Sequence, residues 1–441
     1  MIYYCNMPNS KIKILFDATL LLNDTTSDGK RAGQYFVALN LLKQLLEKEE
    51  LHITLFSEYR RYIFLSEFVR KHLKDYSKFS VYSYNTWLDR FAISVSRFLL
   101  KHQKKYVYSK ILRKFVRFIG YRIFYIYERF FSKLDLKDYD AFFTPSEPIT
   151  PDIMSVKHLK KYAFLHDTVP ISLKDFYLYN NPFMNWYNCL ENSLSPECTY
   201  FTNSETTKSD FLTYYPFLSD KQFSVALLGA AERFTPVKNQ DLIKSVKLKY
   251  GLPTDKKFAF VLSSLDQRKN FFFILDNFIE FVTRYEIDDI ILVIAGAVKE
   301  DYVEVFEDKL ASIPKHLKDK IFWIGYVDDL DVPVLYSGAL MFLMPSIYEG
   351  FGMPILEAMK CACPVICSNT SAMPEVIGDC GIMIDPYENE ELISAICKMY
   401  FNENFRKVCI AKGLSRAKNF SWQHCAGVIA DKIISDFSAQ K

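Results

Sequence analysis

The sequence lacks several features that would place a protein in a familiar class. It has no run of about twenty apolar residues, so we expect no membrane-spanning helix. Residues 1–8 have no basic flank followed by an apolar core, so we expect no secretory signal peptide. No G-x-G-x-x-G segment occurs, and the dinucleotide fingerprint of dehydrogenases is therefore absent.

Disulfide spacing is also missing, although the chain contains ten cysteines. A long, enzyme-like chain gains little from disulfide bonds, and we therefore expect a reducing, cytoplasmic location. Cys361, Cys363 and Cys367 lie close together in the sequence, but no histidine is near them. We interpret these three as small buried hydrophobic side chains rather than as metal ligands.

A strong excess of charge is absent too. The formal net charge of +3 is too small to indicate nucleic-acid binding by itself. Half of the residues are hydrophobic and 24% are charged, which is typical of a globular protein. A chain of 441 residues is too long for one ordinary core and suits two domains of roughly 200 residues each.

Short apolar runs alternate with helical segments along both halves of the chain. The predicted strands are 11–17, 51–56, 139–143, 161–165 and 199–202 in the first half, and 257–265, 290–295, 321–325 and 339–344 in the second. Such alternation predicts an α/β fold with doubly wound parallel sheets, one in each of two Rossmann-like domains.

The segment 345–357 is the most informative stretch of the sequence. It follows the predicted strand 339–344, and Pro354 is well placed as the first residue of a helix. The segment therefore predicts a strand, a glycine loop and a helix N-terminus, whose free N–H groups favour an anion such as phosphate. Gly350 and Gly352 would let the backbone come close to that anion.

Two glutamates flank this glycine loop. Glu349 lies in the loop, and we expect Glu357 in the first helical turn, so both could face one ligand. Carboxylates accept hydrogen bonds from hydroxyl groups, and sugar and ribose rings carry many hydroxyls. Two glutamates beside a loop that favours phosphate therefore indicate a nucleotide sugar as the ligand. The alternative is that Glu357 only stabilises the helix N-terminus while Glu349 is solvated.

Two further strand ends carry candidate residues. His166 follows the strand 161–165 and would lie at the carboxyl edge of a parallel sheet, where such sheets bind ligands. Arg268 and Lys269 follow the strand 257–265 and could neutralise a diphosphate in place of a metal ion. A structural histidine and a solvated basic pair are the alternatives.

The stretch 97–133 combines many lysines and arginines with many aromatic residues, and Glu128 is its only acid. A basic helical stretch rich in aromatics is attracted to an anionic membrane surface. The alternative is a solvated basic face with its aromatics in the core. Single-stranded nucleic acid also stacks on aromatics, but nothing in the stretch resembles a known nucleic-acid module, so we expect no such partner.

The run E-G-F-G-M-P-I-L-E-A-M at 349–359 resembles the signature of family-4 retaining glycosyltransferases, whose fold is the two-domain GT-B architecture with an interdomain cleft. G-Y-V at 325–327, S-A-M-P-E-V at 371–376 and the segment 223–236 agree with the same family in order. The likeness is dense from about 204 to 422 and patchy before that.

The resemblance implies a role for each candidate residue. Glu349 would contact the donor sugar, and Glu357 would hold the ribose. The histidine of the family's His-Asp pair corresponds to His166. Many members have an arginine where this chain has Ser264, and Arg268 would compensate. The remaining donor-binding residues would be Gly350, Phe351, Gly352 and Met353 through their backbone, Val327 beside the base, and Gly33 in a loop near the phosphates. For Gly33, a simple surface turn is the alternative.

By the same resemblance, residues 1–230 would form the acceptor-binding domain, 231–420 the nucleotide-sugar domain, and 421–441 a helix that crosses back. The expected reaction is transfer of a hexose (mannose, glucose, rhamnose or similar), with retention, to a glycan or lipid-linked glycan in cell-surface polysaccharide biosynthesis, such as that of lipopolysaccharide O-antigen. We expect no cofactor and no metal, and a peripheral position on the inner face of the membrane. A GT-B nucleotide-sugar epimerase and a non-catalytic glycosyltransferase-like subunit are the alternatives.

Overall fold

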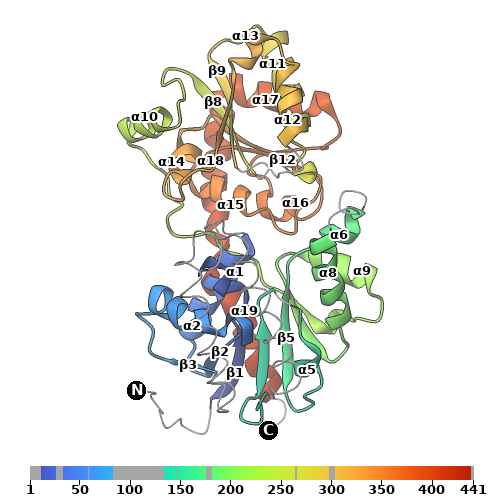
Figure 1. Ribbon diagram of the computed structural model, residues 1–441. Helices are drawn as coiled ribbons and strands as arrows, with labels where there is room; N and C mark the ends of the chain where they lie inside the picture. The colour runs from blue at the N-terminus through green and yellow to red at the C-terminus, as the bar shows by residue number, and fades with distance from the viewer. Residues whose placement is uncertain are drawn as a thin grey trace, which may run out of the picture.

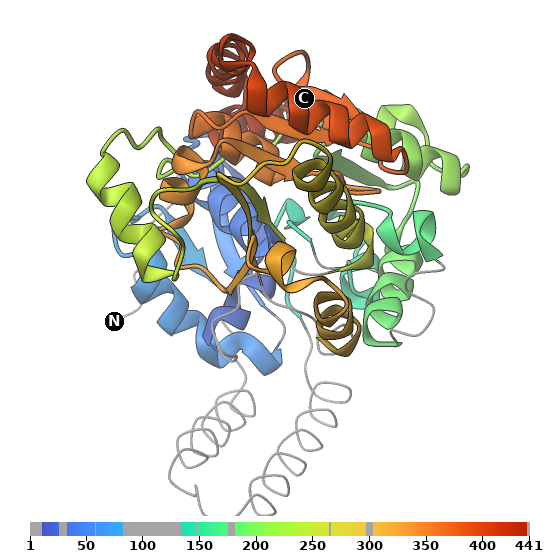
Figure 2. The ribbon, with the colours of Figure 1, turned by 90° about the horizontal axis from the view of Figure 1, so that it is seen from above.

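The computed structural model describes residues 11–25, 33–57, 59–82, 134–146, 148–174, 181–263, 266–296 and 303–438. These residues form two halves, each built around a parallel sheet, that are stacked along the long axis of the molecule (Figure 1). The second half covers much of the first when the molecule is seen from above (Figure 2). Within the described ranges, no helix combines the length and the apolar character needed to cross a membrane.

The first sheet has the strand order β3-β2-β1-β4-β5-β6-β7, and all its neighbouring strands are parallel. Its strands are β1 (Ile12–Asp17), β2 (Leu51–Phe56), β3 (Phe79–Val81), β4 (Ala141–Thr144), β5 (Lys160–Leu165), β6 (Cys198–Thr202) and β7 (Phe223–Val225). The α-helices that the structure describes in this half are α1 (Gly33–Leu46), α2 (Tyr59–His72), α5 (Pro151–Met154), α6 (Val169–Ser172), α8 (Asn181–Ser193) and α9 (Glu205–Tyr214).

The second sheet has the order β10-β9-β8-β11-β12-β13 and is also parallel throughout. Its strands are β8 (Lys257–Leu262), β9 (Ile290–Ala295), β10 (Ile321–Gly325), β11 (Met341–Met344), β12 (Val365–Ser368) and β13 (Ile382–Ile384). Around them lie α10 (Gln240–Lys249), the 3-10 helix η3 (Gln267–Lys269), α11 (Phe271–Arg284), α12 (Val303–Ala311), α13 (Lys315–Lys318), α14 (Val332–Gly338), α15 (Met353–Lys360), α16 (Met373–Ile377), α17 (Asn389–Phe401) and α18 (Glu403–Arg416).

Both faces of each sheet are buried. On β1, Ile14 and Phe16 belong to one core cluster, whereas Leu15 between them belongs to another. This is the pattern of a strand covered by helices on both sides, and it explains why the strands are continuous apolar runs rather than alternating ones. The cluster that contains Ile14 also contains residues of the second sheet, such as Phe260, so one core runs through both halves.

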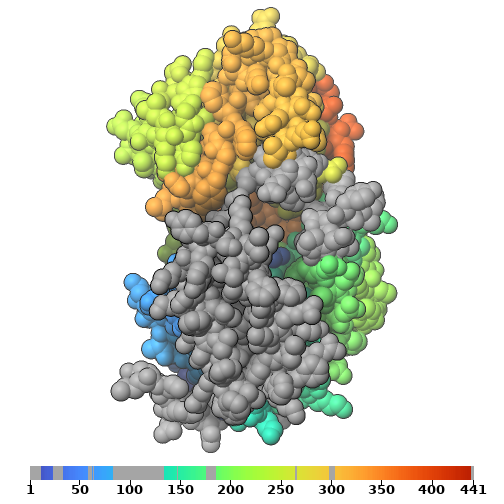
Figure 3. Space-filling model, viewed as in Figure 1, coloured from blue at the N-terminus to red at the C-terminus, as the bar shows by residue number. Residues whose placement is uncertain are grey.

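The chain connects the two halves twice. The first connection follows β7, and the second precedes the last helix, α19 (Trp422–Ser438), which packs against α1 and β7 of the first half. Trp422, Cys425 and Ile429 bury the inner face of α19. The space-filling view shows the described atoms of the second half above those of the first (Figure 3).

The parallel α/β architecture expected from the sequence is confirmed, and the predicted strands 51–56, 290–295 and 321–325 end where the structure ends them. The strands β3, β7 and β13 were not anticipated, because each has only three residues and offers too few positions for a pattern. The strand β7 occupies the beginning of 223–236, which the sequence suggested only as an interdomain crossover.

Candidate functional site

The candidate site lies where β8 and β11 end side by side. These two strands are paired, although β9 and β10 lie between them in the sequence, so the chain reverses its winding direction there. Open α/β sheets bind ligands at the carboxyl ends of the strands at such a switch point. The loop after β8 carries Arg268 and Lys269, and the loop after β11 carries Glu349.

Arg268, Lys269 and Glu349 form one ion-pair cluster. Arg268 Nη1 lies 2.7 Å from Glu349 Oε2, and Lys269 Nζ binds the other carboxylate oxygen. The loops themselves are joined, because Ile347 N donates to Arg268 O (2.7 Å) and Arg268 Nη1 donates to Tyr348 O (3.0 Å). Two cations face one carboxylate, so the cluster has an excess positive charge that suits an anion.

The charges shift one another's pKa. Burial alone would raise the pKa of Glu349, but Arg268 and Lys269 outweigh it and hold that pKa at about 2. The pKa of Lys269 is lowered, first by burial and then by the neighbouring charge of Arg268, with Glu349 opposing both. Glu349 is therefore an ionised hydrogen-bond acceptor at neutral pH.

The glycine loop is held from both ends. Glu349 N donates to Ser371 Oγ (2.9 Å), and Gly352 has a φ of 98° as the N-cap residue of α15. Since φ is positive there, a side chain would be strained at this position. The helix begins at Met353, so Pro354 is its second residue rather than its first as predicted.

The placement of Glu357 in the first helical turn was wrong. Because α15 begins at Met353, Glu357 is past the first turn, which contains no acid. Burial raises its pKa to about 8, although the charge of Arg233 opposes the shift, and Tyr336 Oη lies 3.5 Å from its Oε2. The charges acting on Glu357 come from Arg233, Asp329 and Lys360 rather than from the Glu349 cluster.

His166 stands at the end of β5, as its position in the sequence predicted. Its Nε2 lies 2.8 Å from the carbonyl oxygen of Pro145, and its ring packs against Phe164 at 5.1 Å between centroids. The pKa of His166 is lowered, mainly by burial. The imidazole is therefore neutral at neutral pH.

The two halves meet at Gly350. A Cβ atom added to Gly350 would lie 2.1 Å from His166 O and 2.8 Å from Asp167 Cβ. The glycine therefore allows the loop between β11 and α15 to touch the end of β5 directly, which a larger residue would prevent. This contact brings His166 beside the loop that carries Glu349.

The other predicted donor-binding residues lie in different settings. Gly33 begins α1, and a Cβ atom there would meet no atom within 4 Å. Val327 is buried just after β10, and Met353 is partly exposed at the start of α15. The side chain of Phe351 is buried against Phe420, at 6.0 Å between ring centroids, so only its backbone remains for a ligand. Ser264 and the stretch 97–133 lie outside the described residues.

The three neighbouring cysteines are buried, as interpreted from the sequence. Cys361, Cys363 and Cys367 expose 3% of their surface or less, and burial is the first cause that raises the pKa of each thiol. In the part of the chain that the structure describes, no group of three or more histidine, cysteine, aspartate or glutamate side chains is arranged to hold a metal ion.

Sequence reasoning missed a set of polar contacts between the halves. Tyr348 Oη bonds with Asp210 and Thr168, and Glu375 accepts hydrogen bonds from the first amides of α9. Tyr348 and Glu375 lie inside segments already singled out, so their motifs were a usable signal. Asp210 is an ordinary polar residue on a helix, and nothing in the sequence distinguished it.

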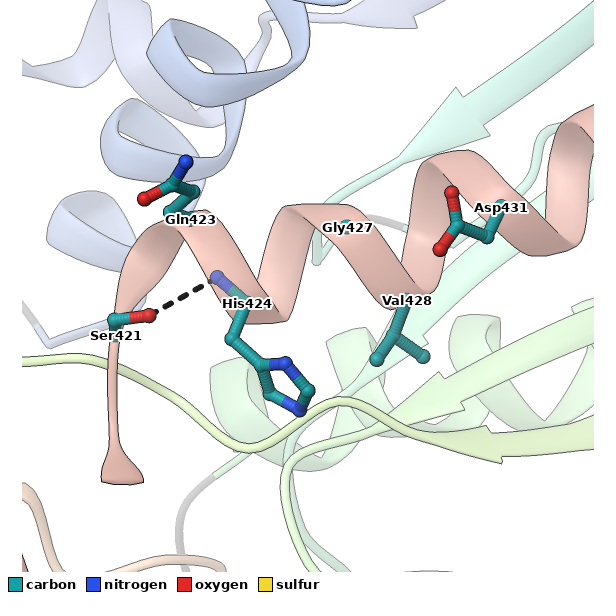
Figure 4. Close-up of a pocket in the computed structure, with 6 residues that line it drawn as sticks. All are labelled: Ser421, Gln423, His424, Gly427, Val428 and Asp431. Atoms are coloured by element: carbon teal, nitrogen blue, oxygen red, sulfur yellow. Dashed lines mark hydrogen bonds between the residues drawn. The ribbon is translucent and has the colours of Figure 1, made fainter. Parts of the chain in front are cut away.

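A pocket of about 340 Å³ lies along α19 (Figure 4). Gln423 and His424 point to different sides of the helix in this view. No predicted site residue lines the pocket, which is formed by Ser421, Gln423, His424, Gly427, Val428 and Asp431.

Comparison with known proteins gives a consistent picture. Residues 243–416 match the family described as glycosyl transferases group 1. The O-antigen chain mannosyltransferase B of Escherichia coli is 47% identical over 105 residues, which are 24% of this chain and 28% of that protein. The serotype-specific mannosyltransferase WbdA of Escherichia coli is 27% identical over 272 residues, 60% of this chain and 32% of that protein. The matches thus span about a third or less of these relatives.

Solved structures share the fold over nearly the whole chain. Anabaena Alr3699/HepE, crystallised with UDP and glucose, has a TM-score of 0.62 at 16% identity, covering 96% of this chain and all of that one. WaaG, described as a glycosyltransferase involved in lipopolysaccharide biosynthesis, has a TM-score of 0.59 at 14% identity, covering 96% and 99%. The two stacked parallel-sheet halves are therefore those of the GT-B fold.

Proposed function

We propose that this chain, whose residues 243–416 match the family described as glycosyl transferases group 1, moves a hexose from a nucleoside-diphosphate sugar to a glycan hydroxyl with retention of configuration. The observation that carries the proposal is the cluster of Arg268, Lys269 and Glu349 at the paired ends of β8 and β11, next to His166. It combines two cations for a diphosphate with an ionised acceptor for sugar hydroxyls.

Each residue of the cluster has a task in this reaction. As the bond between the anomeric carbon and the diphosphate oxygen breaks, negative charge grows on the diphosphate, and Arg268 and Lys269 stabilise it. Glu349 orients the sugar through its hydroxyls. The acceptor hydroxyl attacks from the same face, forms the new bond to the anomeric carbon and gives its proton to the departing diphosphate, so no side-chain nucleophile is required.

Mannose is the first sugar to test. The matched relatives are named as mannosyltransferases, one of them for an O-antigen chain, and this supports a cell-surface polysaccharide as the product. The HepE structure contains UDP and glucose, so the uridine donors belong in the same experiment.

The full chain should be incubated with UDP-, GDP- and dTDP-hexoses, with and without glycan acceptors, and the product linkage read by NMR. We expect acceptor-dependent transfer with retention from one donor. Conversion of a donor to its epimer without acceptor would instead indicate an epimerase. Nucleotide-sugar binding without turnover of any donor would indicate a non-catalytic subunit.

We propose that this transfer needs no metal ion, because Arg268 and Lys269 supply the positive charge that a metal would otherwise supply. Activity should be unchanged by EDTA, and alanine at both positions should raise the donor KM more than either single change. Loss of activity in EDTA that magnesium or manganese restores would refute this proposal.

We further propose a peripheral position on the cytoplasmic face of a membrane, where a lipid-linked acceptor would be found. The support is the composition of 97–133, in which aromatic residues are interspersed among many basic ones. Each cation near anionic lipid contributes on the order of 1 kcal/mol, so attachment should be sensitive to salt. Flotation with anionic and neutral liposomes tests this, with charge reversal at Lys104, Lys105, Arg113 and Lys114 as the variant. If the protein floats with neither the anionic nor the neutral liposomes, the proposed membrane attachment is ruled out.

A further inference from the structure

Glu349 is flanked by two residues that are both anchored on the same helix of the other half, α9. On one side, Tyr348 Oη reaches Asp210 on α9 and lies 3.1 Å from Thr168 Oγ1, just after β5. On the other side, Gly350 O accepts hydrogen bonds from Ser204 Oγ (2.8 Å) and Thr207 Oγ1 (3.1 Å) at the N-terminus of α9.

The same helix end holds a second element of the donor half. Glu375 on α16 accepts hydrogen bonds from the amides of Glu205 and Thr206, each at 2.8 Å, and from the Thr206 hydroxyl. A carboxylate at a helix N-terminus pairs with amides that have no partner inside the helix. The carboxylate of Glu375 therefore caps these two amides of α9 from the other half of the molecule.

Burial makes these contacts specific. Thr168, Ser204 and Thr207 have no exposed surface, and Tyr348 is 9% exposed. A buried hydroxyl or carboxylate that loses its partner is left unsatisfied, which costs more than a solvated bond is worth. The two halves consequently have one favoured register at this interface rather than a range of sliding positions.

We propose that Tyr348 is a positioning residue, which fixes the Glu349 cluster against the first half through the bond between its hydroxyl and Asp210. Its backbone belongs to the site, since Arg268 Nη1 donates to Tyr348 O and the next residue is Glu349. Its side-chain hydroxyl, in contrast, contacts Asp210 and Thr168 of the first half. Any shift of the side chain is thus transmitted to the carboxylate that holds the sugar, and to its distance from the acceptor side.

This inference rests on the proposed function, because the position of the Glu349 cluster relative to the first half affects kcat only if the site transfers a sugar. Tyr348→Phe keeps the ring and removes only the hydroxyl. We expect kcat for transfer to fall about ten- to a hundredfold, as for loss of a hydrogen bond to a charged group, while the affinity for the nucleoside diphosphate changes less than about twofold. In an Asp210→Ala background, the same change should have little further effect.

Tyr250→Phe is the matched control. Its hydroxyl donates to Asp331 at 2.8 Å within the second half alone, so the control removes a similar bond away from the interface and should leave kcat unchanged. Thermal unfolding of both variants shows whether they are folded, so that a lower kcat in a folded Tyr348→Phe can be assigned to a displaced Glu349 cluster. If Tyr348→Phe unfolds, Asp210→Asn removes the charge with little change of volume and is measured instead.

Hydrogen exchange supplies a readout that does not depend on turnover. The amides of Glu205 and Thr206 should exchange faster in Tyr348→Phe than in the wild type or in Tyr250→Phe, because the interface loosens. Unchanged exchange together with unchanged kcat overturns the positioning role. A wild type that turns over no donor contradicts the proposed function, and unchanged exchange alone then overturns the inference about Tyr348.

Discussion

Glu349 and Glu357 have opposite electrostatic environments although they belong to one short motif. Two adjacent cations hold the pKa of Glu349 at about 2, whereas burial raises that of Glu357 to about 8. The first is a permanent anion at neutral pH, and the second is mostly protonated. The two residues should therefore respond differently to the same substitution.

Glu349→Gln should lower kcat strongly with little effect on nucleotide binding, since its expected partner is the sugar. Glu357→Gln should mainly weaken nucleotide binding. A hydrogen bond to a charged group contributes roughly 1.5–3 kcal/mol, so we expect changes of about ten- to a hundredfold for Glu349→Gln at neutral pH and for Glu357→Gln at pH 9, where its carboxyl is ionised. Steady-state kinetics and nucleotide titration check this. Wild-type values in both variants would mean that the site is elsewhere.

Donor affinity should rise with pH if Glu357 binds the ribose as a carboxylate. With a pKa of about 8, only roughly a tenth of the molecules carry this carboxylate at pH 7 and roughly nine tenths at pH 9. Donor KM should therefore fall up to about tenfold across this range, and Glu357→Gln should abolish the dependence. A donor KM that does not change from pH 7 to 9 in the wild type would contradict the ribose role.

The same pKa predicts the sign of the effect on stability. Because the folded pKa of Glu357 is raised above its ordinary value near 4.5, the folded state binds the proton more tightly than the unfolded state. Its contribution to the free energy of unfolding is full below pH 4.5 and is lost as pH rises toward 8. Ionisation of Glu357 at high pH would thus favour the proposed donor binding and at the same time weaken the fold.

At the scale of elements, the loop between β11 and α15 requires a glycine where it meets β5. Gly350→Ala would place a Cβ atom 2.1 Å from His166 O, so the halves would have to move apart. Overpacking typically costs about 1–3 kcal/mol, and we expect kcat/KM to fall at least tenfold while both sheets stay folded. Circular dichroism and kinetics measure these two effects.

Gly427→Ala on α19 is the control, because a Cβ atom there meets nothing within 4 Å and alanine favours a helix. This variant should keep wild-type activity and unfold at the same temperature or slightly higher. If Gly350→Ala behaves like Gly427→Ala, the contact between the glycine loop and β5 is unimportant for the reaction.

The sequence predicted elements well where a strand was long and buried on both faces, as for β9, since a continuous apolar run has few other interpretations. It located the cations after β8 and Glu349 after β11, because both follow such runs. It misplaced Glu357 by assuming that Pro354 begins the helix. It could not reveal Asp210, because the partner of a polar helix residue depends on how the two halves pack together.

At the scale of the molecule, one core cluster includes residues of both sheets together with Ile429 of α19. We therefore expect a single cooperative unfolding transition rather than one for each half. Ile429→Ala should lower the free energy of unfolding by about 2–5 kcal/mol without splitting the transition. The exposed Gln423→Ala should change it by less than about 0.5 kcal/mol. Calorimetry decides, and two separate transitions in the wild type would contradict a shared core.

The two connections between the halves touch each other at Gly229, where a Cβ atom would lie 2.4 Å from the backbone nitrogen of Trp422. The second half is thus an insertion into a first half that is discontinuous in sequence, and both junctions of the insertion lie at one place in space. A chimaera that exchanges the whole second half between relatives needs only one compatible junction region, with glycine kept at 229. If the second half binds the donor, as proposed, a new donor specificity could be combined with an existing first half in one exchange.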